Sequence, residues 1–148
     1  MADTTQAIET FSDTLMGFTL PARSARGRIV RMEGVLEEVL RAHNYPAPIT
    51  HLLGEALVLG ALMGGLLKGE HAQMTLQAQT QGGIVSLLVC DYRNGAVRGY
   101  ADFDAERLAR LGANPSLPAL FGEGYLAITF ETEGRQRYQG IVPLEGDS

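Results

Sequence analysis

The sequence contains a single cysteine, Cys90, and no tryptophan. One thiol cannot form an intrachain disulfide, and it cannot build a zinc site from several cysteine ligands. Basic residues are also absent from the start of the chain, since neither Lys nor Arg precedes Arg23. A secretory signal needs a basic start followed by an apolar run, and this N-terminus has neither. We therefore expect a cytoplasmic protein.

Charge and size narrow the class further. The 148 residues carry a formal net charge of -5, which argues against a nucleic-acid binder with a broad basic face. The chain is 45% hydrophobic with a mean hydropathy of +0.01, which excludes an intrinsically disordered protein. A chain of this length buries roughly 68–70% of its unfolded surface, enough for a core without a disulfide or metal. We expect one domain over residues 1–148.

The first predicted helix follows an arginine-rich stretch. Apolar residues recur at helical spacing between Val35 and Leu40, with charged residues on the other face. We expect this helix to end at His43-Asn44, because Asn44 tolerates a left-handed turn and Pro46 cannot continue the helix.

A second, more apolar helix is expected from near Pro48 to about Lys68. Its stretch Ala56–Met63 is apolar all round except for Gly60, and a helix without a polar face is buried on every side. A glutamate and several glycines interrupt the stretch, which is too short to predict a membrane span. We therefore expect a buried central helix, in which Gly60-x-x-x-Gly64 lets a neighbouring element approach closely.

Strands are predicted where apolar and polar residues alternate, or where short apolar runs are bounded by turns. They are expected at Asp13–Leu20, Gly27–Met32, His71–Thr80, Ile84–Cys90, Ala96–Ala101, Tyr125–Glu131 and Gln136–Leu144. Asn94-Gly95 is a strong signal for a type I′ hairpin turn. The predicted fold class is α+β, a mostly antiparallel sheet packed against the buried apolar central helix.

Three further segments complete the prediction. Met1–Phe11 is polar and unpatterned, and is expected to be a loose N-terminal arm. A short charged helix is expected over Asp102–Leu111, with Asp102 or Asp104 as its cap. The prolines of Pro115–Pro118 predict irregular chain.

No residue pattern predicts enzyme chemistry. His43, His51 and His71 lack the spacing of a helical zinc motif, and we interpret them as surface or capping residues. Ser86 lacks the glycine-flanked elbow of a nucleophile, and no phosphate-binding glycine loop is present. Cys90 ends an apolar strand beside an aspartate, which opposes thiolate formation, so we interpret it as a core cysteine. We therefore predict no enzyme, and no catalytic, cofactor-binding or metal-binding residue.

Three features leave two interpretations open. The arginines of Arg23–Arg31 could recognise an anion, although the sequence favours pairing with the nearby glutamates of Glu33–Glu38. The helix Leu52–Leu67 could offer a hydrophobic surface to partner proteins, although the sequence favours a core position. The glutamine-rich face of His71–Gln81 is either solvated or in contact with another copy of the chain.

A series of short segments, in order along the chain, resembles a known family. The segments are Arg26-Gly27-Arg28-Ile29-Val30, His43-Asn44-Tyr45-Pro46, Leu52-Leu53-Gly54-Glu55-Ala56-Leu57, Leu66-Leu67-Lys68, Met74-Thr75-Leu76-Gln77-Ala78-Gln79, Val97-Arg98-Gly99-Tyr100-Ala101, Gly122-Glu123-Gly124-Tyr125-Leu126-Ala127-Ile128-Thr129 and Tyr138-Gln139-Gly140-Ile141-Val142-Pro143-Leu144-Glu145-Gly146. They span about Phe11–Asp147. The ordered set resembles the N-terminal core domain of the redox-regulated 33 kDa heat-shock chaperones (33 kDa chaperonin).

The resemblance implies an ATP-independent holdase that binds unfolded client proteins under oxidative or heat stress, and a homodimer. Members of this family continue into a C-terminal domain in which C-x-C and C-x-x-C motifs hold zinc and act as a redox switch. This sequence lacks those cysteines, so it is either a truncated N-terminal core domain, which we favour, or a natural protein without the switch. No cofactor is expected in this chain, zinc is expected in the full-length family member, and neither nucleic acid nor a membrane is an expected partner.

Two rival interpretations stay open from the residues alone. The chain could be a small-molecule protein that binds an anion through the Arg23–Arg31 cluster and a histidine. It could also be an oligomeric scaffold that associates through exposed strands and the N-terminal arm. The sequence assigns no client-binding residue.

Overall fold

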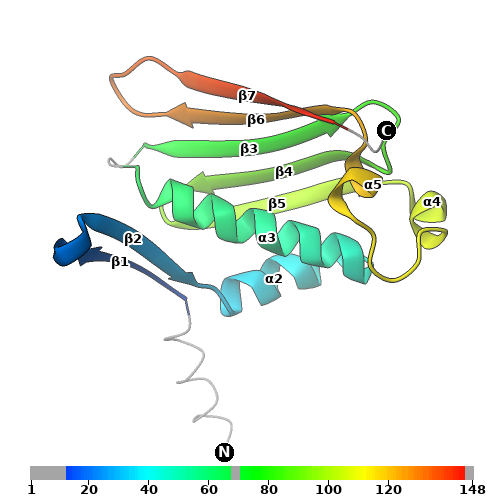
Figure 1. Ribbon diagram of the computed structural model, residues 1–148, viewed down its shortest axis with the longest axis horizontal. Helices are drawn as coiled ribbons and strands as arrows, with labels where there is room; N and C mark the ends of the chain where they lie inside the picture. Colours follow the sequence, from blue (N-terminus) through cyan, green and yellow to red (C-terminus); the bar gives the residue numbers. More distant parts are fainter. Residues whose placement is uncertain (1–12, 68–70, 146–148) are drawn as a thin grey trace, which may run out of the picture.

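The chain folds into two antiparallel β-sheets and one long helix that contacts both (Figure 1). A computed structural model describes residues 13–67 and 71–145, so the predicted arm Met1–Phe11 lies outside the described residues. The strands are β1 (Thr14–Leu20), β2 (Ala25–Arg31), β3 (Gln73–Thr80), β4 (Val85–Arg93), β5 (Ala96–Phe103), β6 (Gly124–Glu131) and β7 (Tyr138–Leu144). The helices are the 3₁₀ turn η1 (Pro21–Arg23), α2 (Gly34–His43), α3 (Ala47–Gly64), α4 (Ala105–Ala109) and α5 (Leu117–Phe121). The predicted α+β fold class is confirmed.

The larger sheet has five strands in the order β5-β4-β3-β6-β7, and every neighbouring pair is antiparallel. At the turn between β4 and β5, Asn94 and Gly95 have φ angles of 49° and 77°, as the predicted type I′ turn requires. Directly opposed residues in antiparallel strands share a face of the sheet. Met74, Leu76 and Ala78 of β3 therefore form one apolar inner face together with their partners in β4 and β6.

Helix α3 packs on this inner face through small residues. A Cβ atom added to Gly60 would lie 2.7 Å from the sulfur of Cys90, and one added to Gly64 would collide with the ring of Tyr92. The close approach predicted for Gly60-x-x-x-Gly64 is therefore confirmed, and the approaching element is strand β4. Without side chains at these two positions, the helix axis can come near enough to the strand for the flanking leucines to reach the core.

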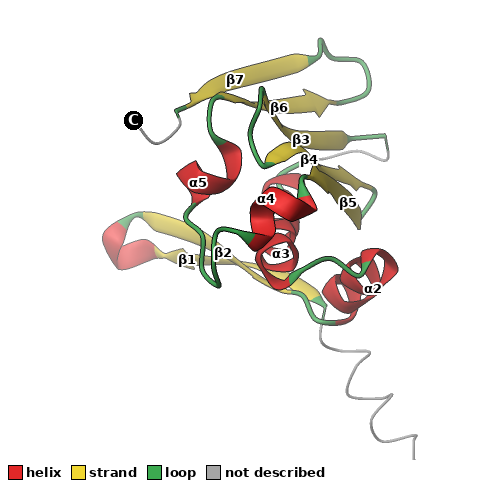
Figure 2. Ribbon diagram, turned by 90° about the vertical axis from the view of Figure 1, so that its right-hand side faces the viewer, coloured by secondary structure: helices red, strands yellow, loops and turns green. Residues whose placement is uncertain are grey.

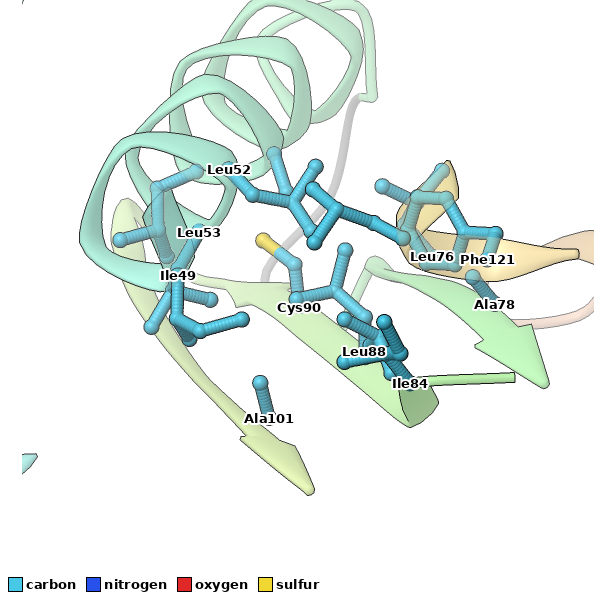
Figure 3. Close-up of a cluster of buried hydrophobic side chains, with 14 of the residues drawn as sticks. Ile49, Leu52, Leu53, Leu76, Ala78, Ile84, Leu88, Cys90, Ala101 and Phe121 are labelled. Atoms are coloured by element: carbon cyan, nitrogen blue, oxygen red, sulfur yellow. The ribbon is translucent and has the colours of Figure 1, made fainter. Parts of the chain in front are cut away.

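The buried core lies between α3 and the five-stranded sheet (Figure 3). It consists of Ile49, Leu52, Leu53, Ala56, Leu57, Met74, Leu76, Ala78, Ile84, Val85, Leu88, Cys90, Ala101, Leu108, Leu120 and Phe121. Burying a leucine or isoleucine side chain is worth about 1.5–3 kcal/mol. The hydrophobic effect on one side of α3 is thus the main force that holds the helix against the sheet.

Helix α3 is shorter and less buried than the sequence predicts. Leu59 stays 43% exposed, so one side of the helix has no cover, and the prediction of burial on every side is wrong. An evenly apolar pattern cannot show which side lacks a partner. The helix ends at Gly64 rather than near Lys68, which lies outside the described residues. Within the described residues α3 alone is long and apolar enough to cross a membrane, a test that core helices also pass.

The end of α2 fastens the helical layer to the edge strand β5. Asn44 has a φ of 50°, which confirms the predicted left-handed helix end. The ring of His43 stacks on that of Tyr45 with a centroid distance of 4.8 Å. His43 Nε2 lies 3.0 Å from the carbonyl oxygen of Gly99, and the Tyr45 hydroxyl accepts a hydrogen bond from the backbone N–H of Ala101 at 3.1 Å. These side chains occupy backbone groups on the outer edge of β5.

Side-chain caps at the starts of α4 and α5 decide two predictions for the segment after β5. The Asp104 carboxylate accepts a hydrogen bond from the Arg107 N–H, so Asp104 rather than Asp102 caps α4. The prediction of irregular chain at Pro115–Pro118 is wrong over its last part, because α5 forms there. Ser116 caps α5 by accepting from Ala119 N–H, and proline is tolerated in the first helical turn, where its missing N–H has no intrahelical partner.

The glycine contact predicts opposite effects for two alanine substitutions in α3. Gly60→Ala should lower the free energy of unfolding by about 1–3 kcal/mol, because the added methyl group overlaps the Cys90 sulfur. Gly54→Ala is the matched control: its Cβ would meet nothing within 4 Å, so the higher helix propensity of alanine should raise stability by up to about 1 kcal/mol.

Urea unfolding followed by circular dichroism measures both effects. The variant Gly60→Ala with Cys90→Ala should recover part of the loss, since the second change removes the sulfur. Equal changes for Gly54→Ala and Gly60→Ala would contradict the packing described above.

Candidate functional site

A groove with almost entirely apolar walls lies beside α3, and it is referred to below as the apolar groove. It has a volume of about 340 Å³. Its walls are Leu52, Glu55, Ala56, Leu59, Leu76, Ala78, Leu88, Leu117, Pro118, Phe121, Gly122, Leu126, Leu144 and Glu145. Figure 2 shows α5 on the same side of the five-stranded sheet as α3, where the two helices flank this part of the inner face.

The groove exists because α3 does not cover the whole sheet. The helix packs against β3, β4 and β5, and the inner face continues past it onto β6 and β7. Leu126 and Leu144 on these two strands line the groove together with residues of α5, and α3 does not pack over them. On β7, Val142 stays 54% exposed on this inner face. A strip of apolar sheet is thus left open between α3, α5 and the edge of the sheet.

The chemistry of the groove suits apolar side chains of a binding partner. Its charged members, Glu55 and Glu145, have carboxylates, whereas nearly all the other lining residues are apolar. Burial of apolar surface is favourable and non-directional, so such a groove selects for hydrophobicity rather than for one shape. It has no convergent set of polar groups of the kind that orients a small-molecule substrate.

Sequence reasoning did not find this site. Its lining comes from five separate stretches of the chain, and the start of α5, which forms one wall, was predicted as irregular chain. The alternative that Leu52–Leu67 presents a hydrophobic surface was the nearest signal, and Leu59 does face the groove. Helical periodicity alone could not show which residues of that stretch remain open.

None of the three histidines lines the apolar groove, and each has a different partner. His43 contacts β5 as described above, His51 pairs with Glu55 at 3.1 Å, and His71 approaches Glu133 at 3.9 Å. The latter two pairs are exposed and contribute at most about 1 kcal/mol. Within residues 13–67 and 71–145 no group of three or more His, Cys, Asp or Glu side chains could hold a metal ion.

The arginines of Arg23–Arg31 are spread over η1 and β2 rather than gathered around one point. Arg28 donates from Nη1 to the carbonyl oxygen of Gly65 at 2.7 Å, beyond the end of α3. The predicted pairing with Glu33–Glu38 is wrong for the described residues, where Glu37 pairs with Arg41 instead. Arg41 lies one helical turn from Glu37 within α2, and it is therefore closer to the Glu37 carboxylate than any arginine of β2 is.

Cys90 lies fully buried in β4 beneath α3 (Figure 3). Burial, and to a smaller extent the negative charge of Asp91, raises the pKa of the thiol to about 12. A thiol with so high a pKa is protonated at neutral pH and is a poor nucleophile. The interpretation of Cys90 as a core cysteine is therefore confirmed.

Comparison with protein-family models decides the relationship. The family model described as Hsp33 protein matches residues 13–147. The chain belongs to the Hsp33 family. The recognition of 33 kDa chaperonins from the ordered segments is thereby confirmed.

Individual Hsp33 relatives are identical to the chain at more than a third of the aligned positions. A 33 kDa chaperonin of Caulobacter vibrioides is 37% identical over 153 residues, which cover 100% of this chain and 50% of the relative. A 33 kDa chaperonin of Pseudomonas aeruginosa is 38% identical over 135 residues, covering 91% of this chain and 44% of the relative. The chain spans about half the length of the curated relatives it matches.

A solved structure shows the same fold. The 33 kDa chaperonin of Thermotoga maritima superposes with a TM-score of 0.70 at 24% sequence identity, over 90% of this chain and 46% of that one. At this identity the likeness supports the fold of the Hsp33 core, in which helix and sheet are arranged as described above.

The burial of Cys90 predicts an inert thiol and a specific pH dependence. In the folded protein Cys90 should not react with a thiol-disulfide exchange reagent near neutral pH, and it should react at once in denaturant. Below pH 9 the thiol is protonated in both states. As pH rises from 9.0 towards 12, the unfolded thiol loses its proton and the folded one keeps it, which favours unfolding.

The free energy of unfolding should therefore fall over this pH range by up to about 1.4 kcal/mol per pH unit through Cys90. Urea titrations at several pH values measure this slope. The Cys90→Ala variant is the control, because it should lack this part of the decline. A rapid reaction of the native thiol, or an identical pH slope in the variant, would contradict the burial.

Proposed function

We propose that the protein is an ATP-independent holdase chaperone that binds apolar segments of unfolded proteins in the apolar groove. The observation that carries this proposal is the open apolar strip between α3, α5 and strands β6 and β7. Membership in a family of chaperones supports it. Holding a client in this way needs no nucleotide and no catalytic residue, because burial of apolar surface supplies the free energy.

The size of the groove fits a weak and adaptable interaction. A volume of about 340 Å³ accommodates a few apolar side chains. Each buried aliphatic side chain contributes about 1.5–3 kcal/mol, before the entropic cost of ordering the client segment is subtracted. Folded proteins keep such side chains inside, so the groove distinguishes unfolded from folded clients by what they expose.

Regulation and assembly belong to the same proposal. The zinc site and redox switch implied by the resemblance would lie in the half of the family-length protein that this chain does not span. The homodimeric state and the cytoplasmic location are further parts of the proposal, supported by the family relationship. In this proposal the protein acts as a binding module rather than as an enzyme.

Suppression of aggregation tests the proposal directly. The protein should reduce light scattering by a heat-unfolded client without added nucleotide. Leu59→Lys should weaken this effect, with about tenfold lower client affinity, because it places a charge in the groove and removes one apolar contact. Leu59 is 43% exposed, so the change should have little effect on stability.

The matched control is Leu111→Lys, since Leu111 is 38% exposed and does not line the groove. It should suppress aggregation as well as the unsubstituted chain. If the two variants act alike, the apolar groove is not the client site. The holdase proposal itself fails if light scattering is unchanged both by the unsubstituted chain and by the full-length protein in its reduced and oxidised forms.

A further inference from the structure

Strands β1 and β2 form a separate two-stranded hairpin at the end of α3 (Figure 1). The register Met16↔Ile29 and Gly17↔Arg28 defines two faces. The face containing Arg28 docks on the helix end, where Arg28 donates to Gly65 O and a Cβ on Gly65 would collide with Leu15. The base of the hairpin is fixed separately, because the Asp13 carboxylate accepts hydrogen bonds from the N–H groups of Glu33, just before α2, and Val35, in its first turn.

The opposite face of the hairpin is apolar and open. Its large side chains are Met16, Phe18, Leu20 and Ile29, all exposed, with Met16 at 60%. Phe18 lies across Gly27, where any Cβ would collide with its ring. A contiguous group of exposed apolar side chains of this kind marks an interaction surface more often than isolated exposed residues do.

Strand β1 is also an unprotected edge. All seven of its residues are exposed, and none is charged or a proline. In the described part of the chain β1 pairs with β2 on one side and with no strand on the other. An uncharged, extended edge with free N–H and C=O groups is a template for the addition of another strand.

The two edges of the five-stranded sheet are guarded, and this contrast makes β1 unusual. On β5 the side chains of His43 and Tyr45 occupy backbone groups of the outer edge, and Arg98 and Asp102 add charge. On β7 Pro143 removes one backbone donor. Charge, side-chain cover and proline are the usual means of blocking strand addition, and β1 has none of them.

The charge around the open face indicates which kind of strand fits. Arg31 lies on this face at the base of the hairpin, opposite Thr14, and Arg23 lies in the turn at its tip. Both are exposed, and within the described residues neither forms an ion pair with a carboxylate. The hairpin thus has a basic residue at each end of β1, although the chain as a whole has a net charge of -5.

We infer that β1 accepts an extended client segment as a third strand, and that the preferred segment is apolar with carboxylates at both ends. Backbone hydrogen bonds to β1 would hold any extended chain. Apolar side chains on one side of the segment would continue the face of Met16, Phe18 and Leu20. The flanking carboxylates would meet Arg31 and Arg23. This inference rests on the proposed holdase function and adds a second client contact, separate from the apolar groove.

A labelled peptide tests the inference on the full chain. The probe alternates valine and threonine between terminal aspartates, and its binding is followed by fluorescence anisotropy. Met16→Lys should weaken binding at least about tenfold, because it places a charge on the edge strand. Ile141→Lys is the matched control, since Ile141 is 62% exposed and lies on the edge strand of the other sheet. It should bind the probe like the unsubstituted chain.

Two changes to the probe separate strand addition from general stickiness. A version with N-methylated backbone amides should lose binding, because it cannot form the strand ladder. A version with lysines in place of the aspartates should bind more weakly to the unsubstituted chain, and the order should reverse for the variant with Arg23→Glu and Arg31→Glu. Equal binding of both versions, or unchanged binding by Met16→Lys, would overturn the inference.

The result also distinguishes this inference from the proposed function. If the chain suppresses aggregation and the probe binds equally to Met16→Lys, the inference fails and the holdase proposal stands. Sedimentation of the unsubstituted and Met16→Lys chains tests a second copy of β1 as the occupant. A dimer that Met16→Lys dissociates, without probe binding to either chain, would overturn the inference in favour of self-pairing.

Discussion

The contact between two glycines of α3 and strand β4 sets the arrangement of the rest of the domain. Gly60 and Gly64 lie one helical turn apart and leave room for the sulfur of Cys90 and the ring of Tyr92. This close approach holds the helix over β3, β4 and β5. The inner face of β6 and β7 extends beyond it, and the apolar groove is the part of that face which the helix cannot reach.

The same constraint relates stability to function in this chain. The side of α3 that carries Leu53 and Leu57 is fully buried and holds the core together, whereas Leu59 on another side is left open to the groove. The proposed holdase function needs apolar surface that is exposed yet held in place, and a helix packed tightly on one side can supply it. The guarded edge of β5 and the open edge of β1 show a similar division between surfaces that are closed and surfaces that are available.

Local patterns in the sequence predict much of this fold. The Asn94-Gly95 turn, the helix end at Asn44 and the packing role of Gly60 and Gly64 each follow from the conformational or steric needs of single residues, so they are visible without a structure. Cys90 is correctly placed in the core because its neighbours form a strongly apolar strand. These features depend on residues that are close together in the chain.

The candidate site depends on tertiary packing and could not be predicted in the same way. The groove brings together residues of α3, α5, β6 and β7. The short helix α5 was not predicted, because Pro118 normally indicates irregular chain. The predicted partners of the arginines were also wrong. Glu37 pairs with the nearer Arg41, and the pairing of β1 with β2, which the sequence does not show, directs Arg28 to the carbonyl oxygen of Gly65. Resemblance to a family identified the chain as a member of the Hsp33 family without locating a binding surface.

The central claim is that unfolded clients contact the apolar groove, and methyl-labelled leucine spectra measure this most directly. When an unfolded client is added to the full chain, the methyl signals of Leu59, Leu117, Leu126 and Leu144 should shift or broaden, while that of Leu111 stays unchanged. Changes that spare the four groove leucines and occur elsewhere would contradict the account.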